Sequence, residues 1–218
     1  MPLFSRLTLV FAAAALAVPS LAHAGDPPVG VQAFAAIDFN QFAASKTYKA
    51  VFGSSSMPGF GGGADVTNIW KHLFVRVAVT HLNKTGSRVF VDAGQVFTLN
   101  EPAKLTLTPV EVGAGWRFVT KNARFTPYAG GSVLIESYKV VYSSSPDLNE
   151  SETFTGSSFF GGVDFAITKL VFVGGEAQLR VLPNALQSPL SSSVANVYNE
   201  KDGGGFTARI AIGVKFGK

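Results

Sequence analysis

Apolar side chains occupy every second position in eight segments of the chain between residues 30 and 216. The positions between them hold small, polar or charged residues. A period of two residues is typical of β-strands, because successive side chains of a strand point to opposite faces of the sheet. The pattern predicts strands at residues 30–40, 59–70, 72–82, 104–118, 127–142, 153–167, 170–182 and 205–216.

The connections between these segments alternate in length. Three are short: Lys71 alone, residues 168–169, and residues 119–126. Four are long and rich in Ser, Asn, Asp, Pro and Gly: residues 41–58, 83–103, 143–152 and 183–204. This sorting is typical of a chain that crosses one membrane repeatedly, with short periplasmic turns and long extracellular loops. We therefore predict an all-β fold, an eight-stranded antiparallel up-and-down transmembrane β-barrel.

The two faces of the predicted sheet differ in charge. One face includes Val75, Val112 and Ile210 and carries no charged residue within the strands. A Lys or Arg that faces lipid at the bilayer centre costs about 2–4 kcal/mol, so this face is expected to contact lipid. The other face carries six acids and five bases, which are predicted to pair in the lumen because an unpaired buried charge is costly. These residues are Asp38, Asp65, Arg76, Glu111, Arg117, Glu136, Asp164, Glu176, Arg180, Arg209 and Lys215.

Aromatic residues on the apolar face fall near the two ends of the strands. Such residues form girdles at the two membrane–water interfaces of transmembrane barrels. The predicted girdle residues are Phe39, Phe60 and Phe206 at the loop end, and Trp70, Trp116, Phe118, Phe165 and Phe216 at the turn end.

The same alternation also fits an inverted arrangement, a soluble periplasmic lipocalin-like barrel that encloses a ligand with its apolar face. The charged face, however, includes many small residues, among them Gly61, Gly113 and Gly162. Small residues suit the narrow interior of an eight-stranded barrel, whereas glycine weakens a water-facing strand without benefit. The small residues on the charged face and the aromatic girdles on the apolar face therefore favour the transmembrane orientation.

The first 24 residues have the features of a secretory signal peptide. Arg6 precedes an apolar run from Leu7 to Val18, and Ala22-His23-Ala24 provides the small residues of a cleavage site. The run is shorter than the roughly 20 residues that a membrane-spanning helix needs. We expect residues 1–24 to be the signal peptide and residues 25–218 to be the outer-membrane β-barrel domain.

The chain offers little chemistry beyond this scaffold. It has no cysteine, and its 18 basic residues barely exceed its 14 acidic residues, which gives no reason to expect a nucleic-acid partner. After cleavage of the signal peptide, the remaining histidines would be His72 and His81. They have no metal-ligand spacing, so neither a metal nor a cofactor is predicted. His81 near a loop leaves open a lipid-modifying barrel enzyme, but an interfacial role for this residue is favoured and no enzymatic activity is predicted.

Three segments of the mature region resemble the small bacterial outer-membrane β-barrels of the outer-membrane protein A and W type. They are Pro127-Tyr128-Ala129-Gly130-Gly131, Phe160-Gly161-Gly162-Val163-Asp164, and the closing strand at residues 208–216. The resemblance implies a location in the bacterial outer membrane and a closing strand that the barrel-assembly machinery reads during biogenesis. It also implies a role in envelope integrity or surface interaction, with a narrow conduit for small solutes as an alternative.

The remaining partner expected from the sequence is the lipid of the outer membrane, including lipopolysaccharide. Lys84, Arg88 and Lys104 lie near the second long connection, where they could contact lipopolysaccharide phosphates or remain solvated loop charges. The sequence indicates neither a specific ligand nor an oligomeric state.

Overall fold

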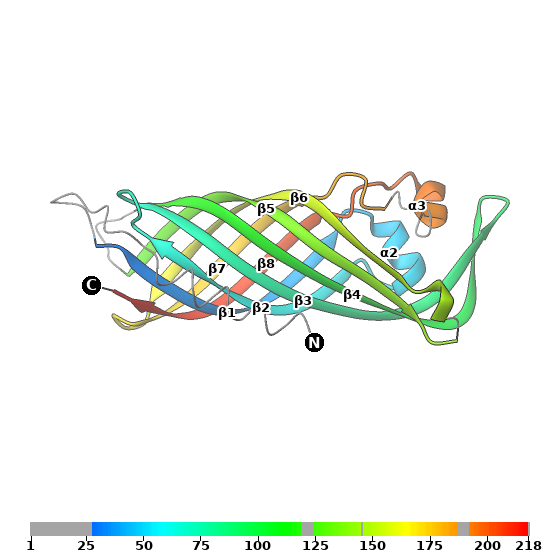
Figure 1. Ribbon diagram of the computed structural model, residues 1–218, viewed down its shortest axis with the longest axis horizontal. Coiled ribbons are helices and arrows are strands. Elements are labelled where there is room, and N and C mark those ends of the chain that lie inside the picture. The colour runs from blue at the N-terminus through cyan, green and yellow to red at the C-terminus, as the bar shows by residue number, and fades with distance from the viewer. Residues whose placement is uncertain (1–27, 119–123, 145, 187–191, 218) are drawn as a thin grey trace.

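The computed structural model describes residues 28–118, 124–144, 146–186 and 192–217. The predicted signal peptide, residues 1–24, lies outside the described residues. Eight antiparallel strands form a closed barrel in which each strand pairs with the next and β1 pairs with β8 (Figure 1). The predicted fold class is thus confirmed. The strands are β1 (Gly30–Phe42), β2 (Ser56–Thr67), β3 (Leu73–Asp92), β4 (Gln95–Arg117), β5 (Phe125–Tyr142), β6 (Glu150–Ala166), β7 (Val171–Val181) and β8 (Gly205–Phe216).

The largest departure from the predicted strands is at β3 and β4, which are 20 and 23 residues long. Residues 83–103, predicted as a loop, instead continue both strands into a hairpin that projects past the rest of the barrel (Figure 1). Ala93 and Gly94 form its tip, with φ angles of 48° and 78°. Two consecutive positive φ values are typical of the tight two-residue turns that close β-hairpins. The prediction of a loop was wrong because the apolar residues of this segment do not alternate strictly and stand among Gly, Pro and polar residues, although the backbone groups of the two strands pair.

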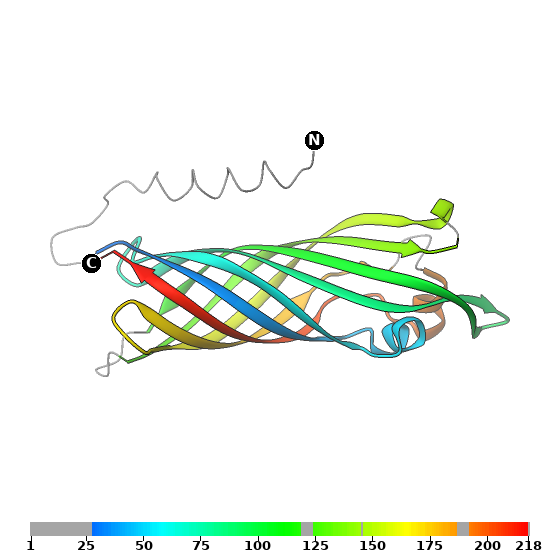
Figure 2. The same ribbon diagram turned by 90° about the horizontal axis from the view of Figure 1, so that it is seen from below.

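The two ends of the barrel have different connections (Figure 2). The loop end carries helix α2 (Ser45–Phe52), the short helix η1 (Pro146–Leu148), helix α3 (Ser192–Tyr198) and the β3–β4 hairpin. The turn end carries the short connections that precede β3, β5 and β7. No helix in the described part of the chain has the length and hydropathy to cross a membrane.

The barrel exterior is apolar and its interior holds the charges. Val75, Val112 and Ile210 are 37%, 46% and 63% exposed, whereas Glu111 and Arg180 are only 3% and 6% exposed. An inverted soluble barrel requires the reverse, so the lipocalin-like alternative is wrong. The apolar side chains face outward, as expected for a barrel surrounded by lipid.

The interior has two layers along the barrel axis. The layer toward the turn end is ionic. The layer at the loop end is an apolar plug in which helix α2 packs against side chains from the strands. The plug consists of Phe42, Ala44, Tyr48, Phe52, Met57, Leu82, Ala103, Leu105, Leu107, Tyr138, Val140, Leu186 and Ala195. The alternation of apolar positions does not predict this layer, because α2 lies in residues 41–58, which the pattern assigns to an extracellular loop.

Candidate functional site

Arg76 and Asp65 occupy paired positions on adjacent strands and both point into the lumen. The Arg76 Nε donates a hydrogen bond to Asp65 Oδ1 at 2.7 Å, and Nη2 donates to Asp65 Oδ2 at 3.1 Å. Its Nη1 forms a further ion pair with Glu176 on β7. Two-point binding of a carboxylate by one guanidinium is among the strongest hydrogen-bonded arrangements in proteins.

Arg209 is the second centre of the ionic layer. Its Nε and Nη2 donate to the two carboxylate oxygens of Asp38 at 2.7 and 2.8 Å. Nη2 also lies 3.2 Å from Glu111 Oε1, and Nη1 lies 3.2 Å from Glu176 Oε1. Glu176 therefore joins Arg209 to Arg76, and the two centres form one network.

Arg117 extends this network toward the turn end. Its Nη1 donates to Asp164 at 2.6 Å, while Nη2 donates to Asp65 and to the Gln32 side chain, both at 2.8 Å. Nearer the loop end, Arg180 pairs with Glu136 and donates to Asn40 Oδ1 at 3.3 Å.

Aromatic rings enclose the guanidinium of Arg76. It lies between 4.9 and 5.5 Å from the ring centroids of Phe34, Phe74, Tyr128 and Phe160, within the range of cation–π attraction. Glycine provides the room for these rings. A Cβ atom at Gly115 would lie 2.6 Å from the Phe74 ring, and one at Gly162 would lie 2.6 Å from the Tyr128 ring.

The structure places ten of the eleven charged residues predicted for the lumen in buried positions, each with an ionic or hydrogen-bond partner there. The eleventh, Lys215, is partly exposed near the turn end and lies 5.2 Å over the Phe172 ring. Sequence reasoning missed the neutral members of the network. These are Gln32, Asn40, Thr80, Tyr128 and Gln178, which share the inward-facing parity of the charged residues.

The predicted aromatic girdle residues lie on the outer face. Phe39, Phe60 and Phe206 are exposed toward the loop end, and Trp70, Phe118 and Phe216 are exposed toward the turn end. The Trp70 and Trp116 rings lie edge to face at 6.2 Å, and the Phe165 ring is 4.9 Å from that of Phe125.

The other candidate residues take separate positions. The His81 ring lies 5.7 Å from the Phe60 ring and the His72 ring lies 5.9 Å from the Trp116 ring, so the two histidines are at opposite ends of the barrel. Within the described residues, no group of three or more acidic or histidine side chains is arranged to hold a metal ion. Lys104 is exposed on the outer face, whereas Arg88 forms an ion pair with Glu101 at 2.9 Å beside a pocket.

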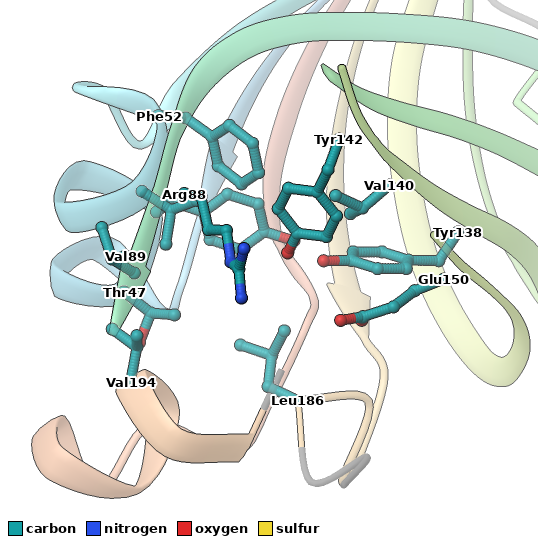
Figure 3. A pocket seen from close by; sticks show the side chains of 12 residues that line it. Thr47, Phe52, Arg88, Val89, Tyr138, Val140, Tyr142, Glu150, Leu186 and Val194 are labelled. Atoms are coloured by element: carbon teal, nitrogen blue, oxygen red, sulfur yellow. The ribbon is translucent and has the colours of Figure 1, made fainter. Parts of the chain in front are cut away.

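This pocket lies at the loop end, above the apolar plug (Figure 3). Its walls come from α2, β3, β5, β6 and the connection between β7 and β8. The polar lining groups include Arg88 and Glu150 among mainly apolar and aromatic side chains. The lining residues are Thr47, Tyr48, Val51, Phe52, Arg88, Val89, Tyr138, Val140, Tyr142, Glu150, Leu186 and Val194.

A closed eight-stranded barrel with an apolar exterior and an ionic lumen defines a transmembrane β-barrel protein. The family described as outer membrane protein beta-barrel domain matches residues 8–216, and the chain belongs to this family. Its members and the structural neighbours described below are outer-membrane proteins of bacteria, and the chain is located in the bacterial outer membrane.

Solved structures confirm the similarity of fold. The outer membrane protein OprG from Pseudomonas aeruginosa is 12% identical with a TM-score of 0.58, covering 88% of this chain and 97% of that one. The N-terminal β-barrel domain of OprF from the same organism is 12% identical, with a TM-score of 0.51 and coverages of 88% and 98%. Ail, the attachment invasion locus protein of Yersinia pestis, is 11% identical, with a TM-score of 0.50 and coverages of 88% and 99%. The search of curated proteins found no match.

Proposed function

We propose that the protein is a closed outer-membrane barrel that stabilises the envelope and takes part in interactions at the cell surface. The observation that carries this proposal is that its ion pairs cross the lumen. Arg76 on β3 binds Glu176 on β7, and Arg209 on β8 binds Glu111 on β4. In a barrel of eight strands, strands four apart in order lie on opposite walls, so these pairs span the diameter.

The energetics support a closed lumen. An eight-stranded barrel is only wide enough for its own side chains. An aqueous path would require several buried pairs to separate, and leaving one partner of a buried pair uncompensated costs about 3–5 kcal/mol. The apolar plug then lies in series with the ionic layer and excludes water from the loop end.

The β3–β4 hairpin supports a role in surface interaction. Phe90, Phe97 and Leu99 are exposed on it, and the Phe90 and Phe97 rings stack at 5.2 Å. This segment projects beyond the loop-end girdle, where lipid does not account for exposed aromatic side chains, and such patches mark interaction sites. Ail, which has a similar fold, is named as an attachment invasion locus protein, so the fold is compatible with a role in surface interaction. The proposal gives His81 no catalytic role, since its ring packs against Phe60 on the outer face.

Conductance measurements in planar lipid bilayers distinguish a closed lumen from the alternative, a narrow conduit for small solutes. We expect the refolded wild-type protein to show no large, stable openings. The variant Arg76→Ala/Glu176→Ala should also lack large openings, because the apolar plug still lies in series with the gap that it leaves in the ionic layer. Large stable openings by the wild type would refute the closed lumen.

A further inference from the structure

The loop-end pocket contains a buried carboxylate that has no counter-charge. Glu150, the first residue of β6, is 8% exposed. Its side-chain carboxylate forms no ion pair or hydrogen bond with any other described residue, although its backbone pairs with Val140 in the sheet. Burial raises the pKa of this carboxyl above its ordinary value, and the nearby Glu152 carboxylate raises the pKa further. The pocket therefore holds a negative group whose charged form would be stabilised by a cation.

Arg88 does not supply that cation. Its guanidinium forms an ion pair with Glu101 at 2.9 Å and lies 5.7 Å over the Tyr142 ring. Figure 3 shows Glu150 beside Tyr138 on one wall of the pocket, with Thr47, Val89 and Val194 on the opposite wall. The guanidinium of Arg88 is thus paired with the Glu101 carboxylate, whereas the Glu150 carboxylate has no paired cation among the described residues.

The walls around Glu150 suit an organic cation better than a metal ion. Tyr48, Phe52, Tyr138 and Tyr142 present aromatic rings to the pocket, and aromatic faces attract ammonium groups. The remaining walls are mostly aliphatic and offer no set of oxygen ligands of the kind that calcium or magnesium requires. An anionic ligand would be repelled by Glu150.

The size of the cavity limits the ligand. Its volume is about 70 Å³, and one water needs roughly 10–15 Å³ on the same measure. The space therefore holds the equivalent of about five waters, which corresponds to a compact group of a few heavy atoms.

We propose that this pocket binds a small organic ammonium compound that enters from the loop end. The ammonium group lies against Glu150 and the tyrosine rings, and the apolar part of the ligand contacts Val140 and Leu186. The proposal goes beyond the closed-barrel function and does not depend on it, because the pocket lies above the plug whether or not the lumen conducts.

Isothermal titration calorimetry on the full chain, refolded in detergent micelles, tests the proposal. The probes are n-butylammonium and tetramethylammonium, with n-butanol as the uncharged analogue and butyrate as the anion. We expect at least one ammonium probe to bind and the other two compounds to bind at least tenfold more weakly. The absence of ammonium binding, or tighter binding of butyrate, would overturn the proposal.

Two variants test whether Glu150 is responsible. Glu150→Gln retains the shape of the side chain and should weaken ammonium binding at least tenfold. Glu152→Gln removes a neighbouring carboxylate that does not line the pocket, and it should change binding less than threefold. Equal losses in both variants, or none in the first, would contradict the assignment. Leu186→Trp provides a second route, since it fills the pocket and should abolish binding while Glu150 remains.

The pH dependence of binding gives a separate signature. Ammonium binding requires the ionised form of Glu150, so affinity should fall as the pH drops through the raised pKa of this carboxyl. The groups that face it are Glu152 on the same strand, Tyr138 and Tyr142 on β5, and Arg88 on β3. The tyrosines do not titrate in the acidic range. An affinity independent of pH between 4 and 7 would contradict the model of an ammonium–carboxylate contact.

Discussion

Individual charges are retained inside this barrel because each buried carboxylate of the ionic network has an arginine partner, and those at the centre of the network accept from more than one strand. Glu176 illustrates the principle, since it accepts from Arg76 on β3, Arg209 on β8, Gln178 on its own strand and the Tyr128 hydroxyl on β5. Burying an ionised carboxylate is costly unless such hydrogen bonds compensate its lost hydration. Neutral donors are therefore as necessary to the network as the arginines.

Mutation of the pair of Arg180 and Glu136 tests directly how much a buried ion pair contributes to stability. Arg180→Met leaves Glu136 buried without its partner, and we expect a loss of about 3–5 kcal/mol in the free energy of unfolding. Adding Glu136→Leu should recover part of that loss, because the uncompensated charge is gone. Urea titration in lipid vesicles, read by heat-modifiable gel mobility, measures both. Lys104→Gln on the exposed outer face is the control, with an expected change within about 0.5 kcal/mol. Strictly additive losses at the two positions would argue against a coupled pair.

At the scale of elements, helix α2 depends on a residue far away in the chain. Its N-cap, Ala44, has no side chain that can cap the helix. Instead the Glu200 carboxylate accepts hydrogen bonds from the backbone N–H groups of Lys46 and Thr47 at 3.1 and 2.8 Å. A carboxylate at a helix N-terminus satisfies free donors and interacts favourably with the helix dipole. The connection before β8 thereby holds α2 over the plug.

We expect Glu200→Ala to loosen α2 without unfolding the barrel. Losing a cap of this kind typically costs about 1 kcal/mol. Hydrogen exchange at the amides of Lys46 and Thr47 should therefore accelerate, while the strand amides remain protected. Asp147→Asn, on another loop, is the matched control and should leave exchange in α2 unchanged. Equal exchange rates in the wild type and Glu200→Ala would show that the cap is not stabilising.

The contact between Glu200 and the N-terminus of α2 also predicts that the stability of this helix depends on pH. Partial burial raises the pKa of Glu200, but the hydrogen bonds from Thr47 and Lys46 outweigh it and lower the pKa below its ordinary value. A depressed folded-state pKa means that the stabilisation is fully present above the pKa of a free glutamate, about 4.3. It is lost as the pH falls further, through the folded-state pKa. A loss of protection at Lys46 and Thr47 in that acidic range, relative to the intrinsic exchange rate at each pH and absent from Glu200→Ala, is the expected result.

The sequence allowed the strands to be predicted well and the loops poorly, for physical reasons. A strand such as β8 reveals itself by strict alternation, because one face meets lipid and the other meets the lumen. Helix α2 and the plug give no such signal, since their burial depends on contacts between distant segments such as Phe42, Leu82 and Leu186. For the same reason the candidate pocket was not predicted. Glu150 lies in a segment whose sequence reads as a polar loop, and it comes beside Tyr138 because the pairing of β5 with β6 extends into that segment.

At the scale of the whole molecule, the turn end and the loop end of the barrel differ in structure. The turn end consists of short connections and the ionic layer, whereas the loop end carries the plug, the pocket and the projecting hairpin (Figure 1). A surface function requires the loop end to face outward, because the candidate pocket and the aromatic patch on the projecting hairpin both lie there. Barrels of this kind place their long connections outside and their short turns in the periplasm.

This orientation can be tested directly because the chain has no cysteine. Gln95→Cys introduces a thiol at the exposed tip of the β3–β4 hairpin, and Lys169→Cys introduces one in the exposed turn before β7. A maleimide reagent that does not cross membranes should label the first variant in intact cells. It should label the second only after the outer membrane is permeabilised, because the turn end then becomes accessible from the periplasm. Lysed cells, in which both thiols should react, are the control for reactivity.

Labelling of Lys169→Cys but not Gln95→Cys in intact cells would place the pocket on the periplasmic side, where a ligand from outside the cell could not reach it through a closed lumen.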